Sequence, residues 1–173
     1  MMKIVLLALA MAGILFACRH EFDEPVINQA LTVDDAQVWY EANKPGNLML
    51  KSGKEGITEK AVKPNWENAT KYESENMEIV ETSLMTQGGL GFFTVESKAE
   101  WEVSKNPGYI SSTTKLVIQK NKKTGESLGF IMTLVGEKNC QEKKGFDLSK
   151  SRYLKIEDDF SGLVLFHDLE GIL

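Results

Sequence analysis

Histidine and cysteine are scarce in this chain, which has two of each among 173 residues. His20 and His167 are far apart in the sequence, and no HExxH pattern, the spacing that lets two histidines on one helix face bind zinc, is present. The chain also lacks a Gly-x-Ser-x-Gly motif, a thiol–imidazole pair and a dinucleotide-binding glycine pattern. The sequence therefore predicts no catalytic residue, no metal site and no cofactor, and we expect a protein that is not an enzyme.

A few polar residues come closest to a catalytic pattern. His167 and Asp168 are adjacent, but neighbours in a strand point to opposite faces of a sheet, so we interpret His167 as a strand-end histidine. Asp158 and Asp159 lack the regular acid spacing of a calcium loop and precede a strand, which favours a solvated turn. Cys140 lies in a polar stretch with no histidine near it, which disfavours a catalytic thiol.

The beginning of the chain is typical of an export signal. Lys3 is followed by an uninterrupted apolar run that is too short for a transmembrane helix, which needs roughly 20 such residues. Small Ala17 then stands directly before Cys18, and the sequence LFAC resembles a bacterial lipobox, in which the cysteine is acylated and the signal is cut before it. We predict a signal peptide over residues 1–17 and a lipid on Cys18 that anchors the protein in a membrane. The alternatives are an ordinary signal peptide and an uncleaved anchor.

Acidic residues follow the predicted anchor within a tether over residues 18–31. Glu21, Asp23 and Glu24 resemble the surface-export signals of lipoproteins from the Bacteroidota, which favours an outer-membrane lipoprotein exposed at the cell surface. The alternative is a solvated tether on a lipoprotein that faces the periplasm. Loss of Lys3 with the signal lowers the net charge from −5 to −6, so we expect no nucleic-acid partner.

Residues 32–173 predict a single α+β domain. Thr32 and Asp35 have the spacing of a capping box, and Lys44-Pro45-Gly46 ends the helix that they begin. One stripe of this helix is interpreted as its packing face: Ala36, Trp39, Tyr40 and Asn43. Residues 46–63 have no sustained period and predict a mobile loop.

Strands are predicted over most of the remaining chain. The run MEIVETSLM is β-rich, and two further runs surround Gly125, which can take the positive φ of a hairpin turn. In the second run of that hairpin, we expect one face to be core (Leu128, Phe130, Met132 and Leu134) and the other to be half-buried (Gly129, Ile131, Thr133 and Val135). A short helical turn is predicted over 99–105 and another strand from Phe160 to His167. The fold class expected is an N-terminal helix on an antiparallel sheet of about four or five strands.

Glycines punctuate the segment after the first of these strands. Gly88, Gly89 and Gly91 are not followed by Lys-Ser/Thr or by a predicted helix, which disfavours a phosphate-binding loop. Because exposed loops carry function more often than strands do, Gly88, Gly89 and Phe92 are the candidate ligand-binding residues, together with the loop over 46–63.

Several segments in this order resemble the N-terminal region of an uncharacterised family of lipoproteins from gut and oral Bacteroidota. They are LTVDDAQVWYEAN, KPNWENA, EIVETSLMTQGGLGFFT, TKLVIQKNKKTGESLGFIMTLV and DFSGLVLFHDLEG. The family has no established activity, so the resemblance implies no residue role. Its members usually continue past the HDLEG turn, and Ile172-Leu173 reads as the start of a further strand, so we expect this chain to be either truncated at its C-terminus or a naturally minimal member of the family.

Three functions remain open at this point. The anchor, the small size and the missing catalytic pattern favour a non-enzymatic binding or accessory module of the cell envelope, with a protein or glycan ligand. The first alternative is the N-terminal pro- or scaffold domain of a larger secreted hydrolase-type lipoprotein. The second is a protease-inhibitor-like module, which rests on fold analogy alone. The ligand and the oligomeric state do not follow from the sequence.

Overall fold

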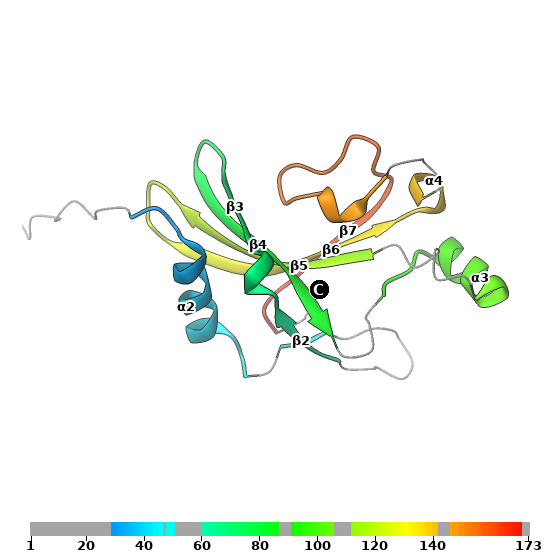
Figure 1. Cartoon of the computed structure of the whole chain (residues 1–173), viewed down its shortest axis with the longest axis horizontal. Helices are drawn as coiled ribbons and strands as arrows, with labels where there is room; N and C mark the ends of the chain where they lie inside the picture. The colour runs from blue at the N-terminus through cyan, green and yellow to red at the C-terminus, as the bar shows by residue number, and fades with distance from the viewer. Residues whose placement is uncertain are drawn as a thin grey trace, which may run out of the picture.

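The computed structural model describes residues 29–46, 48–50, 60–86, 91–105, 112–141 and 146–170 (Figure 1). The elements in chain order are α2 (Val33–Asn43), β1 (Met49–Leu50), β2 (Lys60–Pro64), the 3-10 turn η1 (Trp66–Asn68), β3 (Thr70–Glu73), β4 (Met77–Thr86), α3 (Val95–Ser104), β5 (Ser112–Asn121), β6 (Ser127–Gly136), α4 (Lys138–Gln141), the 3-10 turn η3 (Leu148–Lys150) and β7 (Gly162–His167). The α+β class, with an N-terminal helix on an antiparallel sheet, is confirmed.

Helix α2 begins and ends where the sequence predicts. The side chain of Thr32 accepts a hydrogen bond from the backbone N–H of Asp35, and the Asp35 carboxylate accepts one in return from the Thr32 N–H, which completes the capping box. Of the predicted packing stripe, Ala36 and Tyr40 are buried and Trp39 is partly buried. Asn43 is exposed instead, and its side-chain amide donates to the backbone carbonyl of Trp39 within the helix.

The sheet is an antiparallel meander in the order β1-β2-β4-β5-β6-β7, with β3 pairing the same strand, β4, as β2 does. The longest ladder joins β5 and β6, from Ser112 opposite Val135 to Lys120 opposite Ser127. Gly125 in the turn between them has a φ of 74°, which confirms the predicted hairpin. Helix α3 lies at the end of the molecule away from α2 (Figure 1).

Both faces of the sheet are covered, which corrects the expected burial of β6. Helix α2 lies on one face, and residues 146–160, called the strap from here on, lie on the other (Figure 1). The face expected to be half-buried holds Ile131 and Thr133, each with no exposed surface. Leu128, expected in the core, is 56% exposed. The expectation was wrong because it gave the sheet a single cover, the N-terminal helix.

Glycine at position 129 allows α2 to approach the sheet. A Cβ at this residue would lie 2.4 Å from an indole carbon of Trp39 and 2.9 Å from the Cδ1 of Ile118. The Trp39 ring therefore packs directly on the backbone of β6, and the helix sits closer to the strand than any side chain at position 129 would allow.

Three other expectations about the bounds of elements are corrected. The predicted mobile loop over 46–63 contains β1 and most of β2, because β2 pairs with β4, from Val62 opposite Thr86 to Pro64 opposite Leu84. The helical turn expected over 99–105 is the second half of α3, which begins earlier because the Thr94 side chain accepts a hydrogen bond from the N–H of Ser97. The last strand begins at Gly162 rather than Phe160.

Candidate functional site

The strap binds the sheet through apolar side chains. Leu148 is buried in one cluster with Ile79, Val117, Met132 and Leu134 of the sheet. Further side chains of the strap pack on this cluster: Phe146, Tyr153, Ile156 and Phe160. The strap is thus part of the core, and the side chains that it places at the end of the sheet are held in fixed positions.

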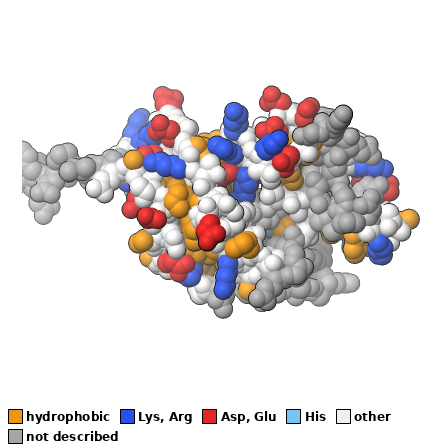
Figure 2. Space-filling model, in the orientation of Figure 1, with side chains coloured by type: hydrophobic (Ala, Val, Ile, Leu, Met, Phe, Trp, Pro, Cys, Tyr) orange, Lys and Arg blue, Asp and Glu red, His pale blue; other side chains and the backbone are white. Residues whose placement is uncertain are grey.

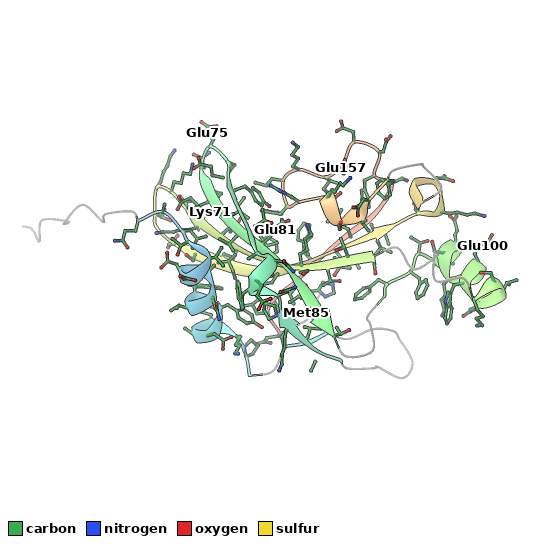
Figure 3. The ribbon with its side chains drawn as sticks, viewed as in Figure 1. Lys71, Glu75, Glu81, Met85, Glu100 and Glu157 are labelled. Atoms are coloured by element: carbon green, nitrogen blue, oxygen red, sulfur yellow. The ribbon has the colours of Figure 1, made fainter. Side chains whose placement is uncertain are left out.

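A buried ion pair lies under the strap. Glu81 on β4 and Lys115 on β5 have side chains that are 4% and 9% exposed, and the Lys115 Nζ lies 2.8 Å from the Glu81 Oε1. The same ammonium donates to the backbone carbonyls of Ser149 (3.2 Å) and Ser151 (2.6 Å). Figure 3 places Glu81 in the middle of the sheet, whereas Glu157 lies out on the strap. The Lys115 ammonium therefore links Glu81 on the sheet to two backbone carbonyls of the strap.

The second oxygen of Glu81 also binds the strap. The Glu81 Oε2 accepts a hydrogen bond from the Tyr72 hydroxyl at 2.8 Å and from the backbone N–H of Tyr153 at 3.1 Å. The Tyr72 hydroxyl lies equally close, at 2.8 Å, to the backbone carbonyl of Tyr153. Burial, together with the neighbouring Glu81 carboxylate, raises the pKa of Tyr72 far above its ordinary value, so this phenol stays protonated. The single hydroxyl proton of Tyr72 is donated to one of these two acceptors at a time, and the bond from the Tyr153 N–H to Glu81 ties the strap to the sheet.

The ring of Tyr153 forms one wall of an open apolar groove. Three rings meet there edge to face: the ring centroids of Phe130 and Tyr153 are 5.0 Å apart, and that of Phe166 lies 5.7 Å from the first and 6.2 Å from the second. The groove has a volume of about 600 Å³, and these residues line it: Gln119, Leu128, Gly129, Phe130, Tyr153, Phe166, His167 and Asp168. Leu128 and Phe166 are 56% and 48% exposed.

The groove has the properties of a binding surface. Large apolar side chains that cluster at the surface, on a rigid support, are typical of sites for ligands or partner proteins. Asp168 is the charged residue in the lining, beside four apolar or aromatic side chains (Leu128, Phe130, Tyr153 and Phe166). By contrast, the face in Figure 2 carries lysine, arginine, aspartate and glutamate side chains interspersed, without a large area of one sign. The groove is therefore suited to bury apolar and aromatic groups of a ligand.

The residues singled out in the sequence lie elsewhere. Cys18, Gly88 and Gly89 are outside the described residues, so the lipid anchor and the glycine-rich binding loop stay predictions. Phe92 is half-buried; its N–H donates to the Ser112 hydroxyl, and its ring centroid is 6.3 Å from that of His167.

The remaining polar candidates have the structural roles expected of them. His167 is the last residue of β7 and is only 3% exposed, as expected of a strand-end histidine. Asp158 and Asp159 are exposed in a turn. Sequence reasoning missed the groove, although Leu128, Phe130 and Phe166 were visible as strand residues, because no local signal indicated that residues 146–160 pack on the sheet.

The described ranges hold neither a metal site nor a membrane-spanning helix, and comparison with known proteins finds no match for this chain. No group of three or more histidine, cysteine, aspartate or glutamate side chains there could hold a metal ion. No helix in that part of the chain is long and apolar enough to cross a membrane. No protein-family model, curated protein or solved structure matches this chain. The case for a function therefore rests on the groove and its supports.

Proposed function

We propose that this protein is a non-enzymatic binding module of the bacterial cell envelope, held to the outer membrane by a lipid on Cys18. The observation that carries the binding role is the groove between Tyr153 and Phe166, an aromatic surface that a buried ion pair holds in place. A binding site needs side chains that are both exposed and fixed, because ordering them on binding would cost free energy. The acidic residues after Cys18 favour display on the outer surface.

The anchor is tested by the intact mass of the protein extracted from membranes of the native host. We expect a polypeptide that starts at Cys18 and carries acyl chains. In the Cys18→Ser variant, we expect the acyl mass to be absent and the protein to leave the membrane fraction. An unlipidated mass for the unchanged chain would contradict the anchor.

The binding role is tested by site-specific photo-crosslinking on living cells. A photoreactive residue at position 166, in the groove, is compared with one at position 103. Val103 is 89% exposed on α3, and α3 is ion-paired through Glu100 to Lys138, beyond the end of β6 that is opposite to Leu128. We expect discrete crosslinked species from position 166 only, and we expect them to disappear when Leu128→Asp places a charge beside the rings. Equal labelling from both positions, or none from either, would refute a binding role for the groove.

A further inference from the structure

Strand β7 carries an open and unprotected edge. It pairs with β6 on one side, and no strand in the described part of the chain pairs with its other side. Natural sheets protect such edges with lysine, proline or a bulge, yet the six residues GLVLFH contain no lysine, arginine, acid or proline. Leu163 and Phe166 of this strand are 50% and 48% exposed. An edge of this kind is suited to pair with another extended chain.

The register shows which backbone groups point outward. The N–H of Glu137 donates to the carbonyl of Ser161 at 2.8 Å, which makes these two residues a hydrogen-bonded pair at the start of the ladder. Hydrogen-bonded and non-hydrogen-bonded pairs alternate in an antiparallel ladder, so Leu163 and Leu165 direct their backbone groups to β6. Gly162, Val164 and Phe166 therefore direct their carbonyls and N–H groups to the open side, at the two-residue spacing that an added strand requires.

The side chains of β7 connect this edge to the groove. Phe166 lies opposite Met132 and Val164 opposite Leu134, so both point to the face of the sheet that the strap covers. Phe166 is one of the three rings of the groove. A strand added to β7 would thus place every second side chain beside the groove, where an apolar residue would be buried against Phe166.

The charged residues that flank β7 in the sequence, from Glu157 onward, are all acids. Exposed acids stand on both sides of the strand: Glu157, Asp158 and Asp159 precede it, and Asp168 and Glu170 follow it. No lysine or arginine occurs after Lys155 in this sequence. A second copy of β7, in either direction, would bring acids against acids, which disfavours self-pairing. A strand with basic residues at its ends would meet charges of opposite sign.

We infer that β7 accepts an added strand from a polypeptide partner, an extended apolar segment with lysine or arginine at both ends. This inference rests on the proposed binding function and specifies its ligand. The backbone of the partner pairs with Val164 and Phe166, its apolar side chains enter the groove, and its terminal cations lie near the acidic residues that flank β7.

The test measures binding of a defined peptide, KKVTVTVKK, to the lipidated protein in detergent micelles by fluorescence anisotropy. We expect saturable binding, and hydrogen exchange should show new protection of the Val164 and Phe166 amides when the peptide is present. The matched peptide EEVTVTVEE should bind at least tenfold more weakly. A peptide with the same side chains but N-methylated at alternate residues should not bind, because it cannot complete the ladder.

Two variants locate the site. Val164→Pro removes one outward N–H, and proline is tolerated on an edge strand where that group faces away from the sheet, so we expect binding at least tenfold weaker with the fold intact by circular dichroism. If this variant does not fold, Leu163→Lys provides the same test, because it places a cation on the edge that repels the basic peptide.

The possible outcomes separate this inference from the proposed function. Binding that is unchanged in the variants, or equal for both charged peptides, would overturn the added strand. Amide protection of Val164 that rises with protein concentration and without peptide would show self-pairing and would also overturn it. If crosslinking from position 166 persists while no peptide binds, the groove has a ligand of another class; if that crosslinking also fails, the proposed function falls as well.

Discussion

Replacing Lys115 by methionine tests the structural role of the buried ion pair. Methionine keeps an unbranched side chain of similar length but carries no charge and no hydrogen-bond donor. The change leaves the Glu81 carboxylate with the Tyr72 hydroxyl and the Tyr153 N–H as its partners. It also removes the donor that the Ser149 and Ser151 carbonyls share.

The expected loss of stability follows from the burial of the Glu81–Lys115 pair. Removing one partner of a buried ion pair costs about 3–5 kcal/mol, because the remaining charge is left without compensation. The two carbonyls of the strap add to this, since a buried acceptor that loses its donor costs about 1–3 kcal/mol when water cannot replace it. The hydrogen bonds that remain on Glu81 offset part of the loss. We therefore expect Lys115→Met to lower the free energy of unfolding by about 4 kcal/mol.

Urea denaturation measures this loss. With a slope of about 2 kcal/mol per molar urea, a loss of about 4 kcal/mol moves the midpoint down by about 2 M. The control is Lys98→Met, which removes the exposed partner of Glu102 on α3, where the side chains are 64% and 55% exposed and the nitrogen–oxygen distance is 3.8 Å. Such a pair contributes about 0.3–0.5 kcal/mol. If Lys115→Met costs no more than Lys98→Met, the ion pair does not hold the strap and the reasoning fails.

Three further perturbations probe other contacts. Gly129→Ala should cost about 1–3 kcal/mol in urea denaturation, because the new methyl group displaces the Trp39 ring; a neutral result would contradict the close packing. Tyr72→Phe should lower stability at pH 7. Because folding raises the pKa of Tyr72, its contribution is complete below about pH 10 and declines progressively as the pH rises above that value, so the difference between the two proteins should shrink in alkali; a constant difference would refute this. Hydrogen bonds from Thr32 lower the pKa of Asp35, so Asp35→Asn should be less stable than the unchanged chain at neutral pH, and this difference should be lost as the pH falls below about 4 through the lowered pKa; parallel pH curves would exclude that linkage.

Local signals in the sequence predicted several elements well. Thr32, Asp35 and Lys44-Pro45 defined both ends of α2, because capping and proline act within a few residues. Gly125 located the β5–β6 hairpin for the same reason. The alternation in β6 predicted which residues share a face, but which of the two faces would be more buried depended on what covers them.

The sequence by itself determined the helix, the hairpin and the strand character of the central runs, since these depend on capping, turn conformation and β-propensity over short distances. Only the tertiary structure decided that β2 is a strand, because its hydrogen bonds come from β4. Only the fold brought Glu81 and Lys115, 34 residues apart, together beneath the strap. The groove and the edge of β7 also belong to the tertiary structure, because a surface built from distant strands exists only once the register of those strands is fixed.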